Sequence, residues 1–183
     1  IEGVKNLHAT KHTIIPDRIV AATYISAAAV TGSQIYLDNV MPSHMVSCLS
    51  LFKESGCDIV VYGKRLKVIP PKRLQRIPTV RSLVHPGFPT DAGPLIITML
   101  SVADGTSIFV ENIFENRFRY VGELNRLGAN IKIQGKTAII EGVPNLWGAS
   151  CKCTDLRGGA AIVVAALAAE GQTVIGEISH ILR

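Results

Sequence analysis

The sequence predicts an α/β fold of repeated β-α-β-α-β-β units, with the helices inside and mixed sheets outside. Three aspartates each open an apolar, helix-like run that ends at a glycine and continues into a β-rich stretch. The distances from acid to glycine are nearly constant, at 15, 14 and 16 positions, for Asp17–Gly32, Asp91–Gly105 and Asp155–Gly171. Internal similarity of this kind indicates a repeat architecture.

The second part of the unit is repeated as well. Residues 41–69 and 114–143 each read as a helix, a glycine, a strand, a Gly-Lys turn and a second strand. Gly56 and Gly128 stand where a helix needs a left-handed residue after its last turn. The third copy contains only a helix and a strand before Arg183, the last residue.

The alanine-rich runs 21–30 and 160–169 suit interior helices whose backbones approach closely. Units this short cannot bury both of their faces alone, so we expect them to share a helical core that the sheets cover. The pair Gly158-Gly159 is not a dinucleotide-binding motif, because the required spacing of glycines is absent. The pattern therefore predicts an α/β fold other than a Rossmann fold.

Composition is that of an ordinary folded domain. The chain has 183 residues, 48% of them hydrophobic but only 5% aromatic, so aliphatic side chains must form the core. Nothing resembles a signal peptide, and no apolar run reaches the ~20 residues that cross a bilayer. We expect a cytoplasmic protein without a membrane partner. The chain starts at Ile1 without a methionine and stops after an apolar stretch, which suggests a piece of a longer protein.

The net charge of +5 gathers partly between positions 64 and 76. Such a cluster can attract nucleic acid or another anion. The alternative, a solvated basic hairpin and loop, is favoured because no aromatic platform or nucleic-acid motif accompanies the charge. We therefore expect no nucleic-acid partner.

The four cysteines form neither a disulfide framework nor a metal site. Cys151 and Cys153 are two positions apart, and no second pair completes a zinc motif. Alternation along one strand explains their spacing better. No metal ion or other cofactor is expected.

Each helix-opening aspartate has two interpretations. An aspartate at this position usually caps the helix by accepting a backbone N–H of the first turn. For Asp91 the rigid lead-in of residues 85–89 is longer than capping requires, so the loop can also hold the carboxylate toward a ligand. Asp17 and Asp155 are read more simply as caps. If the repeat units are related by rotation, the helix starts lie at one end of the molecule and favour an anion there.

Four arginines are candidates to join these acids: Arg18, Arg117, Arg157 and Arg183. Arg117 and Arg157 are both predicted at helix starts, where a cation opposes the helix dipole. That placement suggests an anionic ligand or a carboxylate partner, since guanidinium groups match carboxylate and phosphate oxygens in pairs. Surface pairing with a neighbouring acid such as Glu115 is the alternative.

Five segments then carry a family resemblance: HPGFPTD, VENIFENRF, ELNRLGANI, GVPNLWGA and TDLRGGAA. Over its whole length the sequence resembles the second half of the UDP-N-acetylglucosamine enolpyruvyl transferases, a branch of the enolpyruvyl transferase family. The resemblance implies two similar domains of three units each, joined by two chain crossings, with the active site between them.

On that basis the chain divides into two parts. Residues 1–15 are expected to be the end of the first domain and the crossing. Residues 16–183 are expected to be an enolpyruvyl-transferase-type second domain. Its two full repeats cover about 16–77 and 78–148, and its truncated third covers 149–183.

The resemblance also implies a reaction. Such enzymes move the enolpyruvyl group of phosphoenolpyruvate to the 3-hydroxyl of UDP-N-acetylglucosamine and release phosphate, which is the first committed step of peptidoglycan synthesis. Catalytic roles are implied for Asp91, Asp155 and Arg183, with Asp91 the proposed base for the sugar hydroxyl. Substrate contacts are implied for Asp91, Ile113 through its backbone, Arg117, Arg157, Arg183, Asp17 and Arg18.

The sequence also departs from the family. Ala92, Gly93 and Pro94 follow Asp91 where the family usually has Met or Ala and then Gln, and Leu182 replaces a common Asp. The family's catalytic cysteine loop has no counterpart among the four cysteines, so we expect the chain to be inactive alone. The alternative is a non-catalytic ligand-binding or regulatory module on the same fold.

Overall fold

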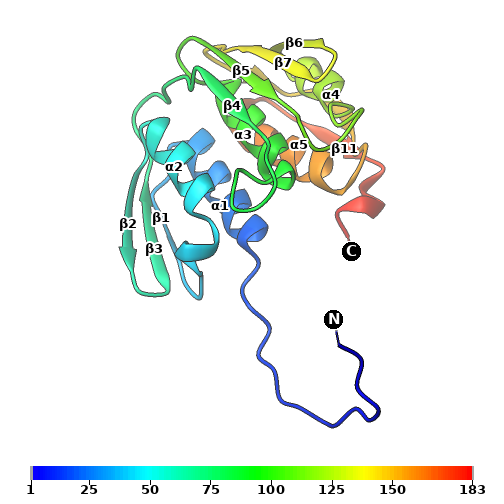
Figure 1. Cartoon of the computed structure of the whole chain (residues 1–183). Coiled ribbons are helices and arrows are strands. Elements are labelled where there is room, and N and C mark those ends of the chain that lie inside the picture. The colour runs from blue at the N-terminus through cyan, green and yellow to red at the C-terminus, as the bar shows by residue number, and fades with distance from the viewer. Residues whose placement is uncertain (1, 183) are drawn as a thin grey trace.

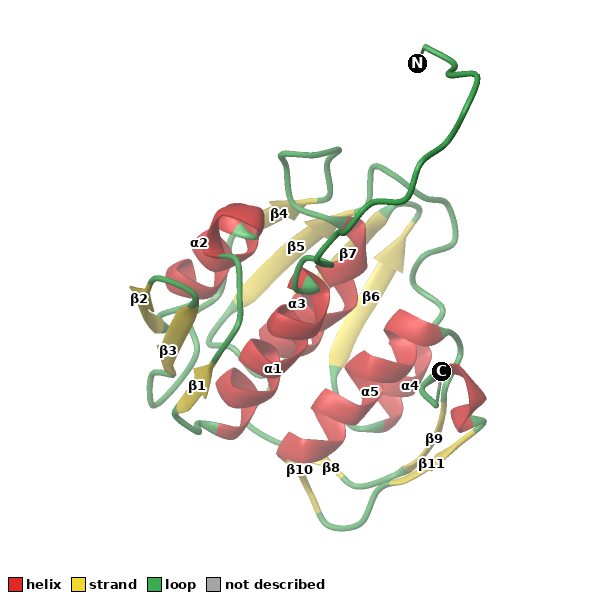
Figure 2. Ribbon diagram, turned by 90° about the horizontal axis from the view of Figure 1, so that it is seen from below, coloured by secondary structure: helices red, strands yellow, loops and turns green. Residues whose placement is uncertain are grey.

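Three helices lie side by side at the centre of the molecule (Figure 2). They are α1 (Arg18–Thr31), α3 (Gly93–Leu100) and α5 (Leu156–Ala168) in the computed structural model, which describes residues 2–182. Every residue of α3 is buried, whereas α1 and α5 each bury one face. The predicted alanine-rich interior is therefore confirmed, because small side chains let these backbones approach one another.

Two sheets cover this helical layer (Figure 1). The first contains β1 (Ile35–Leu37), β2 (Asp58–Tyr62) and β3 (Arg65–Ile69), in the antiparallel order β1-β3-β2. The second contains β4 (Thr79–Arg81), β5 (Thr106–Val110), β6 (Asn130–Gln134) and β7 (Thr137–Glu141), in the order β4-β5-β7-β6. In it β4 runs parallel to β5 while the other pairs are antiparallel, so this sheet is mixed, as predicted.

The third side carries only short parallel pairs. They are β8 (Leu146–Trp147) with β10 (Ala169–Glu170), and β9 (Ser150–Lys152) with β11 (Val174–Gly176). The pairing of β9 with β11 repeats that of β4 with β5, in which a strand ahead of a central helix lies parallel to the strand after it. A central helix followed by a strand is thus present in all three copies, and the parallel strand ahead of that helix is present in the second and the third. The domain boundaries assigned from the resemblance remain a prediction.

The second helices of the units are shorter. They are α2 (Val46–Glu54), which packs against β2, and α4 (Val121–Arg126), which packs against β6 and β9. The predicted left-handed glycines follow them, with φ of 97° at Gly56 and 91° at Gly128. The described part of the chain also contains the 3-10 turns η1 (Pro42–His44), η2 (Thr90–Ala92) and η3 (Ile178–His180).

The basic cluster lies on the exposed β2–β3 hairpin and the loop that follows it. Arg65 pairs with Asp38, and Arg73 pairs with Asp104 at 3.1 Å. Both pairs are more than half exposed, which fits the solvated-hairpin interpretation of these cations.

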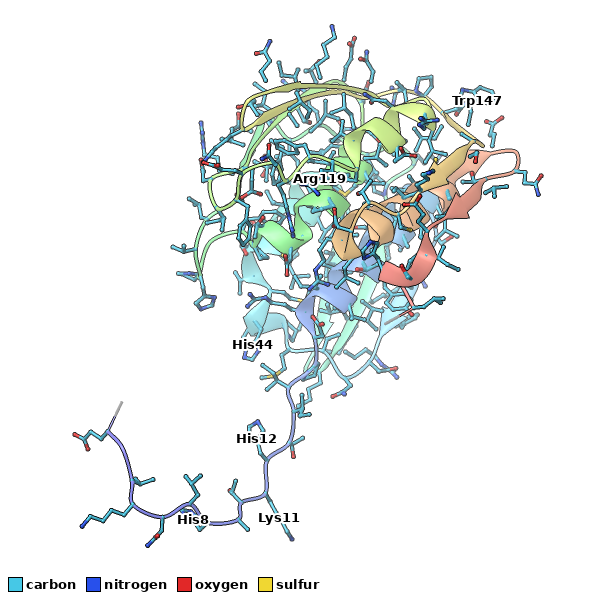
Figure 3. The ribbon with its side chains drawn as sticks, turned by 90° about the vertical axis from the view of Figure 1, so that its right-hand side faces the viewer. His8, Lys11, His12, His44, Arg119 and Trp147 are labelled. Carbon is cyan, nitrogen blue, oxygen red and sulfur yellow. The ribbon has the colours of Figure 1, made fainter. Side chains whose placement is uncertain are left out.

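Residues 2–15 extend away from the body of the molecule and lead into α1 (Figure 3). Their side chains, including the labelled His8, Lys11 and His12, are exposed. Among residues 2–182, no helix combines the length and the apolar character that a membrane crossing demands.

Candidate functional site

The start of α3 and the start of α5 meet through Asp91. Arg117 Nη2 donates to Asp91 Oδ1 at 2.7 Å, and Arg157 Nη2 donates to Asp91 Oδ2 at 3.0 Å. The two arginines come from different units and lie 26 and 66 positions from Asp91. Both arginine side chains are mostly buried, at 23% and 28% exposed, so solvent screens these pairs less than pairs on the open surface. The predicted convergence of acids and arginines at one end of the molecule is therefore present in the structure.

Asp91 does not cap its helix, and the capping part of our interpretation is wrong for this residue. It lies inside η2, and its side chain accepts no backbone N–H from the start of α3. The amide of Gly93 is already donated to the carbonyl of Thr90, and Pro94 in the first turn of α3 has no N–H. The carboxylate is therefore left for the two arginines.

Asp155 and Asp17 do cap their helices. Asp155 Oδ1 accepts the N–H groups of Arg157 at 3.0 Å and Gly158 at 2.8 Å, and Asp17 Oδ1 accepts that of Ile19 at 2.7 Å. Arg157 thus links two acids, because its backbone completes the cap at Asp155 while its side chain reaches Asp91.

Arg117 lies ahead of α4 and not in its first turn, which corrects the prediction from the FENRF segment. A left-handed Asn116, with φ of 53°, precedes it. Its guanidinium lies 5.6 Å from the centre of the Phe114 ring, within the range of a cation–π contact. Its Nε atom is buried without a hydrogen-bond partner among residues 2–182. Glu115, the alternative partner, lies 3.9 Å from Lys136 Nζ instead.

A row of aromatic rings supports the loop that carries Asp91. Phe109 of β5 packs edge-on against Phe88 on one side and Phe118 on the other, with ring centres 6.2 and 6.3 Å apart. A Cβ atom at Gly93 would lie 2.8 Å from the Phe109 ring. The glycine in the unusual Ala92–Pro94 segment is therefore required by this packing.

Glu111 is a site residue that sequence reasoning missed. Its side chain is 1% exposed and accepts hydrogen bonds from Ser82 Oγ at 2.6 Å, Thr90 Oγ1 at 2.7 Å and the backbone N–H groups of Ile113 at 2.8 Å and Phe114 at 3.2 Å. These bonds outweigh the opposing effect of burial and lower the pKa of Glu111. Two-residue alternation places it on the inward face with Ser107 and Phe109, and this was the available signal.

A hollow of about 400 Å³ lies beside Asp91. Arg18, His85, Asp91, Ile113 and Phe114 are among its lining residues. The structure therefore brings Arg18, Asp91 and Ile113 to one hollow, with Arg117 and Arg157 attached through Asp91. Asp17 and Asp155 serve as caps at the adjoining helix starts, and Arg183 lies outside the described residues.

The four cysteines are buried thiols. Burial raises the pKa of Cys48 to about 11 and also raises the pKa values of Cys57, Cys151 and Cys153. Thiols held in the protonated state are poor nucleophiles at neutral pH. Within residues 2–182, no three His, Cys, Asp or Glu side chains are grouped so as to hold a metal ion.

The family can now be assigned. The model of the family described as EPSP synthase (3-phosphoshikimate 1-carboxyvinyltransferase) matches residues 1–183. The chain belongs to the EPSP synthase family. It is 47% identical to UDP-N-acetylglucosamine 1-carboxyvinyltransferase 2 of Caldanaerobacter subterraneus subsp. tengcongensis, a match that covers 100% of this chain and 44% of that relative. It is 46% identical to UDP-N-acetylglucosamine 1-carboxyvinyltransferase 1 of Symbiobacterium thermophilum, covering 100% and 41%.

These relatives confirm the resemblance recognised in the sequence, and the chain spans less than half of their length. Among solved structures of the family, it is similar to the enolpyruvyl transferase NikO from Streptomyces tendae, with a TM-score of 0.82 at 24% identity over 93% of this chain and 40% of that one. It is also similar to an EPSP synthase from Acinetobacter baumannii, with a TM-score of 0.69 at 19% identity, covering 91% and 40%. Both confirm the predicted fold class.

Proposed function

We propose that the chain is part of a cytoplasmic bacterial enzyme that transfers the enolpyruvyl group of phosphoenolpyruvate to the 3-hydroxyl of UDP-N-acetylglucosamine. Phosphate is released, and the step opens peptidoglycan synthesis. The observation that carries the proposal is the Asp91 carboxylate bound by Arg117 and Arg157 beside a hollow. The names of the relatives in this family support the choice of substrates.

In this proposal Asp91 contacts the sugar hydroxyl and accepts its proton. A general base must lie within hydrogen-bond reach of the proton that it removes. Asp91 borders the hollow and is 40% exposed, so its carboxylate is accessible to a ligand there. Ile113, on the same hollow, contributes a backbone contact to the sugar nucleotide.

Arg117 and Arg157 bind the anionic groups of phosphoenolpyruvate. Planar guanidinium groups in a partly dehydrated site stabilise phosphate and carboxylate charge strongly. Each arginine uses one Nη atom on Asp91, and the buried Nε of Arg117 has no partner among the described residues. An anion that binds the same Nη atoms competes with Asp91 for them, and its binding frees the carboxylate to act on the hydroxyl.

The remaining residues are proposed to complete the site. Asp155 lies by the reaction centre while it caps α5, and Asp17 and Arg18 lie near the junction of the two domains. Arg183 closes onto phosphate and carboxylate. The cysteine loop and further substrate-binding residues are proposed to come from the other domain.

Phosphate release tests the proposal. We expect the full-length gene product to release phosphate from phosphoenolpyruvate only when UDP-N-acetylglucosamine is present, and residues 1–183 alone to release none. Failure of the full-length protein to turn over this substrate pair would reject the proposed reaction. Phosphoenolpyruvate without UDP-N-acetylglucosamine is the matched control.

A non-catalytic ligand-binding module is the second candidate. The observation that favours it is the Ala92–Pro94 segment, which departs from the family pattern directly beside Asp91. In that case the full-length protein would bind UDP-N-acetylglucosamine, as measured by calorimetry, without releasing phosphate.

A further inference from the structure

Glu111 joins two segments that lie far apart in the sequence. One of its oxygens, Oε2, accepts the hydroxyl of Thr90, the residue before Asp91. The other, Oε1, accepts the N–H groups of Ile113 and Phe114 as well as the Ser82 hydroxyl. The carboxylate thus ties the loop that carries Asp91 to the Ile113–Phe114 loop, which lines the same hollow.

The connection is reinforced around Ser82. Its Oγ atom donates to Glu111 and also accepts the backbone N–H of Asn112 at 2.8 Å. The amide side chain of Asn112 donates to the Ser82 carbonyl at 3.1 Å. The end of β4, the end of β5 and the start of η2 are therefore held by one partly buried network, in which the charge of Glu111 strengthens each bond that it accepts.

Glu111 itself is too deeply buried to meet a ligand in the hollow. It is 1% exposed, whereas Asp91 and Ile113 both line that hollow. A residue in this position acts on a bound substrate only through the groups that it holds.

We propose that Glu111 is a positioning residue for the proposed transferase site, which fixes Asp91, through Thr90, relative to the backbone at Ile113. The inference rests on the proposed function for its kinetic consequence. The Asp91 carboxylate and the backbone at Ile113 must contact the same sugar nucleotide at the same time. A shift of either loop therefore misplaces the sugar hydroxyl relative to the carboxylate. Misplacements of about 1 Å lower rates by about a hundredfold.

The test uses Thr90→Val, which removes the hydroxyl on Glu111 while keeping a side chain of similar shape. Its control is Thr98→Val in α3, where the hydroxyl is fully buried and makes only a 3.4 Å contact with the Ala161 carbonyl. Thr90→Ser keeps the hydroxyl and is expected to lie closer to wild type than Thr90→Val in every measurement. Glu111→Gln removes the charge but keeps the shape.

The first measurement is amide hydrogen exchange in the full-length protein. Loss of a bond to a charged group corresponds to about a tenfold change. We expect the amides of Ile113 and Phe114 to exchange about tenfold faster in Thr90→Val and in Glu111→Gln, with no change at these amides in Thr98→Val. Unchanged exchange at both amides in both variants would overturn the proposed coupling.

The second measurement is steady-state kinetics of the full-length protein. Thr90→Val is expected to lower kcat and raise KM for UDP-N-acetylglucosamine, and the same change in the Glu111→Gln background is expected to add little. A wild-type protein without activity would reject the proposed function, and the exchange result would still decide whether Glu111 couples the loops. An active wild type with Thr90→Val equal to Thr98→Val in both constants would reject the positioning role alone.

Discussion

Asp91 and Asp155 occupy the same place in two copies of the repeat, yet their carboxylates have different partners. Asp155 accepts hydrogen bonds from the backbone N–H groups two and three positions later in the sequence, those of Arg157 and Gly158. Among residues 2–182, the Asp91 carboxylate accepts hydrogen bonds from the guanidinium groups of Arg117 and Arg157 alone. One aspartate stabilises a helix, and the other is available to a ligand.

The difference has a local cause. Of the two amides that Asp91 would need, one is donated to the Thr90 carbonyl and the other is absent because position 94 is a proline. With the helix start satisfied in this way, the carboxylate is free to meet cations from two other segments. A capping position can thus become a ligand-facing one through changes in the two following residues.

The largest expected effect is the loss of catalytic activity when the Asp91 carboxylate is removed. In the full-length protein, Asp91→Ala is expected to lower kcat by about 10²–10⁴-fold, the usual contribution of a general base. Thr98→Val, a buried substitution in α3 outside the proposed site, serves as the comparison in the same phosphate-release assay. If Asp91→Ala kept most of its activity, Asp91 would have no part in proton transfer.

The next effect concerns the carboxylate that anchors the Asp91 loop. The pKa of Glu111 is lowered in the folded chain, so its contribution to stability is fully present above its usual value of 4.5 and is lost as the pH falls through the folded value. Charge-assisted hydrogen bonds contribute about 1.5–3 kcal/mol each. Urea unfolding should therefore show wild type more stable than Glu111→Gln at neutral pH. The two should converge in acid, and a constant difference across this range would contradict the assignment.

A smaller effect distinguishes capping from charge pairing. Asparagine caps helices about as well as aspartate, whereas alanine costs about 1 kcal/mol of the free energy of unfolding. We expect Asp155→Ala to be less stable than Asp155→Asn by about this amount in thermal or urea unfolding. At Asp91 the two substitutions should have nearly equal stability, because both remove the charge and neither removes a cap. A clear preference for asparagine at position 91 would show that this residue caps α3 in solution.

The features predicted correctly from the sequence are those with local causes. The caps at Asp17 and Asp155 and the left-handed Gly56 and Gly128 each depend on a few neighbouring residues. The repeat could also be predicted, because the same order of helix-like and strand-like segments recurs along the sequence at nearly constant spacing.

The features missed or misassigned depend on tertiary contacts. Glu111 bonds to residues 21 and 29 positions away, and no local signal indicates those partners. Arg117 in the FENRF segment was assigned to a helix start, yet it follows a left-handed Asn116 and lies in the turn before α4. Likewise, Asp91 loses its capping role through the Thr90–Gly93 backbone bond, which belongs to the 3-10 turn and not to the helix pattern.

The smallest expected effect comes from a substitution that gives Asp91 the capping partner that Asp155 already has. Pro94→Ala restores the amide three positions after Asp91, in the place where Gly158 serves Asp155. The new N–H competes with Arg117 and Arg157 for the carboxylate. Because proline is tolerated at this position while alanine frees the unfolded chain, we expect stability to change by no more than about 1 kcal/mol. Hydrogen exchange should show the amide at position 94 protected, and protection should disappear in the Pro94→Ala, Asp91→Ala double variant. An unprotected amide would mean that the arginines hold Asp91 more strongly than a vacant cap can.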